Sequence, residues 1–489
     1  MKKKVITMSI LALLNGFSSS SHALPPSAYN STPGNTLDLF IAGSSALDPA
    51  LLKTLSKSFC TAGSMDVYSY NTQLVVLCTS SVALTGGKTK IALYKNSVGG
   101  SINGVLPVAN GTPLTFISMA ALKANPDLVI TTATVSSTTG LPAYTTHEVS
   151  TITAATQSAI PKAGFSDVEP TLLGLLPHKD GLTRPIDKLI ISNPNALVFG
   201  VTVTKKIRDL LQAKEGLVVG SETEANMPNL TKTQISGIFT GQIIQWSQLG
   251  LPVTGDNTIY VARRPTNSGT FEVFDIYFTG ATCMAGVSGF VTGNSNGQCS
   301  TNGNVSVSAS LDLGACMTNY NTANLGAVGM MSTGFVPVDA INGTQNPGNN
   351  SYRFIKINSA APTLLNVVQG KYELYAETSF QYRNNVTGNE STIYSMLAAG
   401  DFGGGLGGKM GDPTTIDDID NGIQQYWGRS GLLALPSNGY TPVLASGTTI
   451  SSADITANPV HTHTKSPGGY SNNCQPPLSV ANTNLFSKP

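Results

Sequence analysis

The sequence has 489 residues, of which only 11% are charged, and its 28 basic and 27 acidic residues give a formal net charge of +1. Nucleic-acid binding needs a basic stripe, so a chain this poor in charge excludes that class of partner. Any anion site must also be built locally, because the overall field of the protein gives no help.

The first 23 residues have the features of a secretory signal peptide. A basic start (MKKK) precedes the mostly apolar run Val5–Phe17, and small residues end the segment before a predicted cleavage after Ala23. The apolar run is too short to span a bilayer. We therefore expect an exported protein, periplasmic or secreted, in which residues 24–36 form a leader.

The first part of the mature chain predicts alternating strands and helices. An apolar run predicts a buried strand at Leu37–Gly43, and helical spacing after an early Asp-Pro predicts a helix over Ser45–Phe59. A strand at Thr89–Lys95 leads into the Gly/Ser loop Asn96–Ser101, and alternation predicts another strand at Ala196–Thr204.

The pattern continues toward the C-terminus. We expect a capped helix at Thr231–Gly241, a strand at Thr258–Arg264 and a helix at Gly269–Gly280. Leu325–Phe335 is a strand or a crossing between domains, and Lys371–Arg383 alternates like a strand. Strands that feed helices through Gly and Ser turns predict an α/β fold.

Six cysteines are expected to form disulfides, because their number is even and the predicted compartment is oxidising. They are Cys60, Cys78, Cys283, Cys299, Cys316 and Cys474. Short loops favour the pairs Cys60–Cys78 and Cys283–Cys299, which leaves Cys316–Cys474, although other pairings stay open.

The stretch RRPTNSGT (Arg263–Thr270) has the composition of an anion site. Arg264 brings a positive fork, Ser268 and Thr270 bring hydroxyl donors, and the N–H groups of a helix beginning near Phe271 point toward a ligand. The alternative is an ordinary Ser/Thr helix cap with a solvated arginine.

Six stretches, taken together and in order, resemble a known family. They are AGSSALDP (42–49), NSVGGS (96–101), GFSDVEP (164–170), LTKTQISGIFTGQIIQW (230–246), RPTNSGT (264–270) and GAVGMM (326–331). This order is similar to that of the periplasmic phosphate-binding proteins of ABC transporters (PstS-like), in the type 2 substrate-binding protein superfamily. The resemblance covers roughly Leu37 to Arg383 and implies a two-lobed α/β fold with a hinge and a central cleft.

The resemblance also implies a set of phosphate-binding residues on four loops. They are Ser44, Ser45 and Ala46 in the first loop, Ser97 or Ser101 with Gly99 and Gly100 in the second, Asp167 in the third, and Arg264, Ser268, Gly269 and Thr270 in the fourth. The hydroxyls, amides and single guanidinium of this set suit a dehydrated phosphate without an excess of charge.

Asp167 and Thr266 are the informative positions of this set. A carboxylate repels an anion that carries no proton to donate, so Asp167 would exclude sulfate and admit phosphate. The family has an acidic residue two positions after its arginine, and here that position is Thr266. The sequence therefore departs here from the family's pattern, in which that acidic residue pairs with the arginine and fixes its orientation.

The expected organisation is a hinge-closing receptor. Lobe one would combine residues 37–197 with 326–434, lobe two would be the inserted residues 198–325, and residues 435–489 would form an irregular C-terminal tail. The protein would be a monomer that captures inorganic phosphate or a similar oxyanion between the lobes and delivers it to an ABC permease. No cofactor, metal or catalytic residue is expected.

Two alternatives stay open. Some relatives of this fold are described as phosphatases, and hydrolysis of a phosphate ester that depends on Ser45 would favour that reading. A secreted surface or matrix protein could keep the fold without transport, and the long tail and low charge fit it. Absence of both phosphate affinity and a permease partner would favour this second alternative.

Overall fold

The computed structural model describes most of the chain. The described residues are 24–135, 142–151, 155–173, 186–266, 268–284, 287, 289–290, 310–334, 351–398, 431–438, 442, 450–466 and 471–479. The predicted signal peptide with its cleavage after Ala23, and Cys299, lie outside these ranges and stay predictions.

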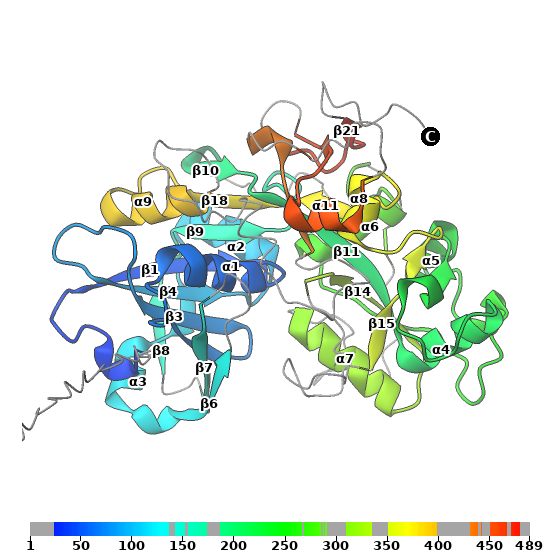
Figure 1. The fold of residues 1–489 in the computed structure, drawn as a ribbon, viewed down its shortest axis with the longest axis horizontal. Coiled ribbons are helices and arrows are strands. Elements are labelled where there is room, and N and C mark those ends of the chain that lie inside the picture. Colours follow the sequence, from blue (N-terminus) through cyan, green and yellow to red (C-terminus); the bar gives the residue numbers. More distant parts are fainter. Residues whose placement is uncertain are drawn as a thin grey trace, which may run out of the picture.

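The first lobe is built on a nine-stranded sheet (Figure 1). In sheet order its strands are β10 (Leu189–Ser192), β18 (Ser379–Arg383), β9 (Ala163–Ser166), β1 (Thr36–Gly43), β4 (Lys90–Asn96), β3 (Gln73–Thr79), β2 (Asp66–Tyr70), β7 (Tyr144–Val149) and β6 (Val129–Val135). β1 pairs in parallel with both β4 and β9, so the carboxyl ends of these three strands lie at one edge. The residues that follow them at this edge are Ser44, Ser97 and Asp167.

Short helices follow two of these strands, and the sequence predicts the first of them. α1 (Asp48–Thr54) continues into a turn of π-helix at Leu55–Phe59, which together cover most of the helix expected over Ser45–Phe59. α2 (Ser101–Asn110) begins where the Gly/Ser loop ends and packs on β9 and β1. Farther along the chain, α3 (Met119–Ala124) and the paired strands β5 (Leu114–Ile117) and β8 (Thr156–Ala159) complete this part of the lobe, and α9 (Gly388–Leu397) lies beside β1.

Glycines let α2 lie unusually close to the sheet. A Cβ atom on Gly104 of α2 would lie 2.2 Å from the carbonyl oxygen of Phe165, and one on Gly164 would lie 2.0 Å from the carbonyl oxygen of Gly104. Gly43, at the end of β1, has a φ of +105° and borders the same contact. This close approach places the first residue of α2 beside the ends of β1 and β9.

The second lobe is built on a sheet around one long strand. β11 (Asn195–Thr204) is buried along its whole length and is flanked by β14 (Ala327–Ser332), β15 (Tyr352–Phe354), β17 (Tyr375–Glu377) and β19 (Leu432–Ala434), while β13 (Tyr260–Ala262) adds to β14. The predicted strand at Ala196–Thr204 is thus confirmed. β14, β15, β17 and β19 come from residues 326–434, the segment that the sequence assigned to lobe one.

Helices surround this second sheet. They are α4 (Lys205–Lys214), α5 (Lys232–Phe239), α6 (Gly269–Phe278), α7 (Ser310–Thr322) and the short α8 (Leu364–Val368). A capping box starts α5: Thr231 accepts from the backbone N–H of Gln234, and the Gln234 side chain accepts from Thr231. The helices expected at Thr231–Gly241 and Gly269–Gly280 are both confirmed. Two further short strands, β12 (Asn229–Leu230) and β16 (Lys356–Ile357), pair in parallel.

Within the described residues the chain passes between the two sheets at two adjacent points, and a further passage falls between α9 and β19, outside the described ranges. Of the two adjacent points, one is the step from β10 to β11, next to Asn193, and the other is Thr378, between β17 and β18. The backbone N–H of Thr378 donates to the carbonyl of Asn195 at 2.9 Å, and the Asn193 amide donates to the carbonyl of Thr378 at 3.0 Å. The single strand predicted at Lys371–Arg383 is therefore two strands, which belong to different sheets.

The C-terminal tail, expected to be irregular, contains α11 (Ser452–Ala457) and the paired strands β20 (His463–Thr464) and β21 (Leu478–Ser479). In Figure 1 this segment lies across the top of the molecule, over the region where the two lobes meet.

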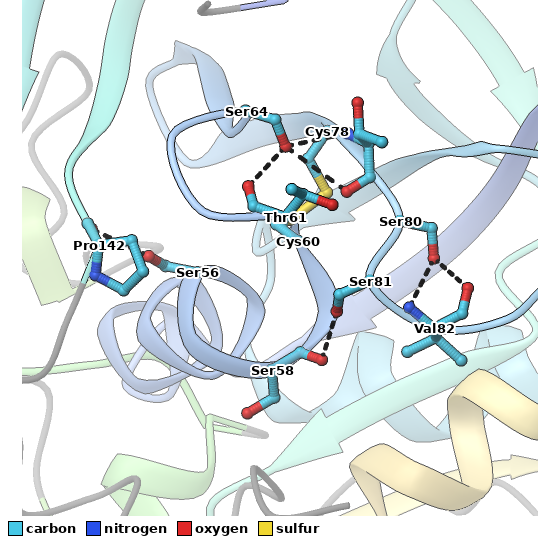
Figure 2. Close-up of a disulfide and its surroundings, with 11 residues drawn as sticks. Ser56, Ser58, Cys60, Thr61, Ser64, Cys78, Ser80, Ser81, Val82 and Pro142 are labelled. Carbon is cyan, nitrogen blue, oxygen red and sulfur yellow. Dashed lines mark hydrogen bonds between the residues drawn. A yellow bond between two sulfur atoms is a disulfide. The ribbon is translucent and has the colours of Figure 1, made fainter. Parts of the chain in front are cut away.

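The disulfides match the sequence prediction only in part. Cys60–Cys78 is present, and Figure 2 shows it within a group of serine side chains of the first lobe. Cys283 pairs with Cys474, so the predicted pairs Cys283–Cys299 and Cys316–Cys474 are both wrong. Cys316 is disulfide-bonded to a partner outside the described residues. Loop length favours neighbours in an unfolded chain, but the packed tail brings Cys474 to the end of α6.

Candidate functional site

Asp167 lies at the centre of the candidate site, directly after β9. Its carboxylate accepts hydrogen bonds from the hydroxyl of Ser44 and, at 2.9 Å, from the hydroxyl of Thr270. Its backbone N–H donates to Oγ of Ser101 at 3.1 Å. Ser44 and Ser101 belong to the first lobe and Thr270 to the second, so turns distant in sequence meet at this carboxylate between the lobes.

The structure distinguishes the two serines that the second loop offered. Ser101, the first residue of α2, lies against Asp167 and is fully buried. Ser97 is also buried, but its hydroxyl accepts from Lys95 at 2.6 Å and donates to Asp48 at 2.7 Å. Ser97 therefore belongs to a neighbouring polar network, and Ser101 belongs to the centre of the site.

The glycines of the second loop allow another close approach. A Cβ atom on Gly100 would lie 3.1 Å from a terminal nitrogen of Arg264 and 3.6 Å from Cα of Ser268, and the φ of Gly100 is +70°. Gly99 is half-buried and also has a positive φ. The loop therefore presents bare backbone to the residues that come from the second lobe.

The start of α6 carries the second-lobe half of the site. Gly269 begins the helix, and a Cβ atom there would lie 2.4 Å from Oγ of Ser101 and 2.6 Å from Cβ of Asp167, so only glycine fits. Ser268 precedes it at the N-cap position without making a side-chain capping bond. Its buried hydroxyl has no hydrogen-bond partner among the described residues. The N-terminus of α6 therefore brings backbone donors and an uncommitted hydroxyl to Asp167.

Arg264 is held inside the protein and not on its surface. Its side chain is 2% exposed, and its charge interacts with that of Asp167. A solvated arginine beside an ordinary helix cap, the alternative reading of this stretch, does not fit this burial. Thr266 lies in the turn that separates Arg264 from α6.

The first loop contributes Ser44, Ser45 and Ala46, all buried. The backbone N–H of Ala46 donates to Oγ of Ser44 at 3.1 Å, which orients the hydroxyl that reaches Asp167. The first-loop serine that touches Asp167 is thus Ser44, one of the three residues that the resemblance implied for this loop.

Sequence reasoning missed a buried lysine next to the site. Lys95, on β4, is fully buried, and its ammonium forms an ion pair with Asp48 at 3.0 Å. The same ammonium donates to the carbonyl oxygens of Gly43 and Ser44 at 3.0 and 3.1 Å. A lysine in an apolar strand directly before a Gly/Ser loop was the available signal, because a buried lysine needs partners nearby.

Burial controls the protonation of these charges. Loss of solvent raises the pKa of Asp167, while the hydroxyl of Ser44, the charge of Arg264, the hydroxyl of Thr270 and the charge of Lys95 pull it down. Burial likewise raises the pKa of Asp48 and lowers that of Lys95, and the attraction between the two opposes both shifts.

The arrangement combines several donors with one acceptor. Hydroxyls, a helix N-terminus and a guanidinium suit the oxygens of an anion, and a carboxylate suits a proton carried by that anion. Within the described ranges, no group of three or more His, Cys, Asp or Glu side chains is placed to hold a metal ion. None of the described helices combines the length and apolar character needed to cross a membrane.

Residues 179–398 match the family model described as the PBP superfamily domain. No curated protein matches the sequence.

Similar solved structures include a putative phosphate ABC transporter substrate-binding protein with bound phosphate from Clostridium perfringens. It is 14% identical with a TM-score of 0.38, and the match covers 73% of this chain and 92% of that one. An ABC-type phosphate transport receptor from Vibrio cholerae is 18% identical with a TM-score of 0.28, over 50% and 75% of the two chains. The PstS of Borrelia burgdorferi is 13% identical with a TM-score of 0.29, over 74% and 93%.

The family match and the two-lobed α/β architecture agree with the fold that the sequence motifs implied. This match covers residues 179–398, which is less than half of the chain.

Proposed function

We propose that this protein captures inorganic phosphate, or a closely similar protonated oxyanion, between its two lobes. The observation that carries the proposal is the meeting of Ser44, Ser101 and Asp167 from one lobe with Arg264 and the start of α6 from the other. The buried hydroxyl of Ser268, which has no hydrogen-bond partner among the described residues, supports it, because a buried hydroxyl without a partner costs free energy unless a ligand uses it. The neighbours from Clostridium perfringens and Vibrio cholerae are described as phosphate-binding transport proteins.

Within this proposal each loop has a role. The hydroxyls of Ser101 and Ser268 and the guanidinium of Arg264 donate to phosphate oxygens, and backbone N–H groups at Ser45 and Gly269 complete the shell. The hydroxyls of Ser44 and Thr270 hold the Asp167 carboxylate in place, and the Ala46 N–H orients Ser44. Gly99 and Gly100 let the second loop approach closely. Asp167 accepts the proton of HPO₄²⁻ or H₂PO₄⁻ and rejects sulfate, which has no proton to offer at neutral pH.

The two crossings near Asn193 and Thr378 are the proposed hinge. Both connect the sheets, and they lie side by side, so a small rotation there moves one wall of the site against the other. We propose these crossings as the boundaries between the lobes, in place of the boundaries at residues 197 and 326. The closed form would exclude water from the site and be recognised by a membrane permease. The protein would act as a monomer in the periplasm or outside the cell.

Calorimetric titration of the mature protein with phosphate, arsenate and sulfate tests the proposal. We expect heat from phosphate and arsenate and none from sulfate at neutral pH. In the Asp167→Asn variant sulfate should bind, because the amide no longer repels it and can donate to it. Absence of phosphate binding in the wild-type protein would refute the proposal.

The proposed role is noncovalent and needs no catalytic residue. A phosphatase of the same fold would release p-nitrophenol from its phosphate ester, and a serine of the first loop would be the expected nucleophile. We expect no release above background with the wild-type protein. Release that disappears in both Ser44→Ala and Ser45→Ala would assign the site to an enzyme instead.

A further inference from the structure

We propose that Lys95 and Asp48 form a positioning pair that shapes the first loop for its anion. This inference rests on the proposed function. Lys95 has no exposed surface, and three of its contacts are with backbone or side-chain atoms at the ends of β1 and β4. The ammonium is therefore committed to this edge of the sheet and does not reach solvent.

Lys95 would favour anion binding through its contacts with two backbone carbonyl oxygens. Carbonyl oxygens carry partial negative charge and repel an anion that lies close to them. Lys95 engages the carbonyls of Gly43 and Ser44, the two residues that lead into the loop, at 3.0 and 3.1 Å. The ammonium thereby keeps these two carbonyl oxygens pointing toward itself and away from the anion site. The Ser44 hydroxyl keeps its hydrogen bond to Asp167.

Asp48 and Ser97 complete the pair. Asp48 lies at the start of α1 and forms an ion pair with Lys95 at 3.0 Å, and the hydroxyl of Ser97 bridges to its second oxygen at 2.7 Å. An unpaired charge inside a protein is costly, so a buried lysine without a carboxylate partner would release its proton or move toward solvent. Asp48 thus keeps the ammonium charged beside Asp167, whose own charge interacts with it.

Three variants separate positioning from simple stability. Lys95→Met removes the ammonium and leaves Asp48 unpaired, so both stability and phosphate affinity should fall. Lys95→Met with Asp48→Asn removes the unpaired charge, so much of the stability should return while phosphate still binds about tenfold or more weakly. Arg353→Met is the matched control, because it breaks the ion pair of Arg353 with Glu222 on the second lobe, at 2.9 Å, away from the site. Its affinity should stay within about twofold of the wild type.

Affinity is measured by calorimetry and stability by thermal unfolding on the same samples. Recovery of wild-type affinity in the Lys95→Met, Asp48→Asn double variant would show that Lys95 only neutralises Asp48, and would overturn the positioning role. Wild-type protein that binds no phosphate would overturn the proposed function itself, a result that the variants cannot produce.

A second inference stands on a different observation, the attachment of the C-terminal tail. The geometry assigns Asn473 and Cys474 as a staple between the lobes. The Asn473 amide nitrogen and backbone N–H donate to the carboxylate of Glu169 at 2.6 and 2.9 Å, and Glu169 lies two residues after Asp167 in the first lobe. The next residue, Cys474, is bonded to Cys283, which follows α6 of the second lobe.

The tail also forms hydrogen bonds at both crossings of the proposed hinge. The carboxylate of Glu377, directly before the crossing at Thr378, accepts from the Thr464 hydroxyl at 2.9 Å, the Lys465 backbone at 2.6 Å and the hydroxyls of Ser466 and Ser471. The Ser471 backbone N–H donates to the side chain of Asn193 at the other crossing, at 3.2 Å. Both crossings are thus bonded to one segment whose end is covalently fixed to the second lobe. The staple therefore limits how far the lobes open.

Removal of this one disulfide tests the staple without phosphate. The double variant Cys283→Ser, Cys474→Ser should open farther, so small-angle scattering of the ligand-free protein should give a larger radius of gyration than wild type. Exchange of the Thr378 amide hydrogen should be about tenfold faster or more. Cys60→Ser with Cys78→Ser is the control, because this disulfide lies within the first lobe, and it should change neither measurement.

Asn473→Ala keeps the disulfide and removes the side-chain hydrogen bond to Glu169, leaving only the backbone one, so it weakens the first-lobe half of the staple and serves if the cysteine variant does not fold. It should increase the radius of gyration in the same direction. Scattering and exchange unchanged from wild type in these variants would overturn the staple.

Discussion

Asp167 is the side chain at which most of the interactions of the candidate site meet. It is buried, it receives hydroxyls from both lobes, and its charge interacts with those of Arg264 and Lys95. Desolvation raises its pKa, so it takes up a proton at a higher pH than a free aspartic acid does. Under the proposed function, its protonation state decides which anions the site accepts.

The discrimination against sulfate should therefore depend on pH. In its ionised form Asp167 repels an anion without a proton. As the pH falls through its raised pKa, which lies above the ordinary value of 3.8, the carboxyl becomes neutral and can donate to sulfate. We expect sulfate affinity to appear and rise on acidification in titrations from pH 7 toward 4, and Asp167→Asn to bind sulfate at every pH. Equal exclusion of sulfate across this range would contradict the role.

Substitution of Ser268 should weaken phosphate binding without lowering the stability of the protein. Its hydroxyl is buried and has no partner among the described residues, so Ser268→Ala removes a group that costs free energy in the ligand-free protein. We expect the midpoint of thermal unfolding to stay the same or rise, while the dissociation constant for phosphate rises about tenfold, as for one hydrogen bond to a charged ligand. Thr270→Ala is the comparison, since it loses a bond to Asp167 and should be less stable. A loss of stability in Ser268→Ala would show that the hydroxyl has another partner.

At the scale of elements, the site depends on where α2 and α6 begin. Each helix starts at a residue that touches Asp167 or its neighbours, and each lies close enough that a Cβ atom would clash at Gly104 or Gly269. The parallel strands β1, β4 and β9 bring their carboxyl ends to the same edge, which is where ligands bind in many α/β proteins.

Gly104→Ala tests whether α2 positions the site from a distance. The added methyl group would lie 2.2 Å from the carbonyl oxygen of Phe165, so α2 must move away from the sheet and carry Ser101 with it. We expect a loss of about 1–3 kcal/mol in the free energy of unfolding, as for other overpacked cores, together with weaker phosphate binding. Gly86→Ala is a surface control, because a Cβ there meets nothing within 4 Å, although its positive φ makes a small cost in stability. Full phosphate affinity in Gly104→Ala would show that Ser101 does not need this contact.

The whole molecule is held together by a tail that bridges its two halves. Residues near Asn473 bond to Glu169 and Glu377, and Cys474 reaches the second lobe. Lys465 of the tail is buried near these carboxylates, and burial lowers its pKa from 10.5 to about 8. The attachment of the tail is therefore sensitive to pH.

The sign of that dependence follows from proton binding. In the unfolded chain Lys465 keeps its proton up to about pH 10.5, whereas in the folded protein it releases the proton near pH 8. Between these values the unfolded state binds more protons, so the contribution of Lys465 to stability rises with pH and is at its lowest below about 8. The free energy of unfolding is measured in urea at pH 7, 8 and 9.5 for the wild type and for Lys465→Met. The value for the wild type minus that for Lys465→Met should become more positive as pH rises. The shift should be on the order of 2 kcal/mol over this range, and a difference independent of pH would contradict it.

Much of the local structure could be read from the sequence. Apolar runs such as Leu37–Gly43 and Ala196–Thr204, and the capped helix after Thr231, follow from side-chain periodicity and capping, which are local properties. The anion motif at Arg264–Thr270 was visible for the same reason, since its donors lie within one turn of chain.

The same local information could not place Lys95 in the site or choose between Ser97 and Ser101. Both questions depend on which atoms of β1, β4 and α2 meet in space. The pairing of Cys474 with Cys283 was missed for a similar reason, because the contact joins residues 191 apart in the chain.

The sequence by itself determined several of the strands and helices, their order, and the residue types that suit an oxyanion. Only the tertiary structure decided that Ser44 and Thr270 meet at Asp167, that a buried Lys95 lies behind the first loop, and that the C-terminal tail bridges the lobes. Periodicity and capping act over a few residues, whereas these contacts are made only when the two sheets and the tail have packed against one another.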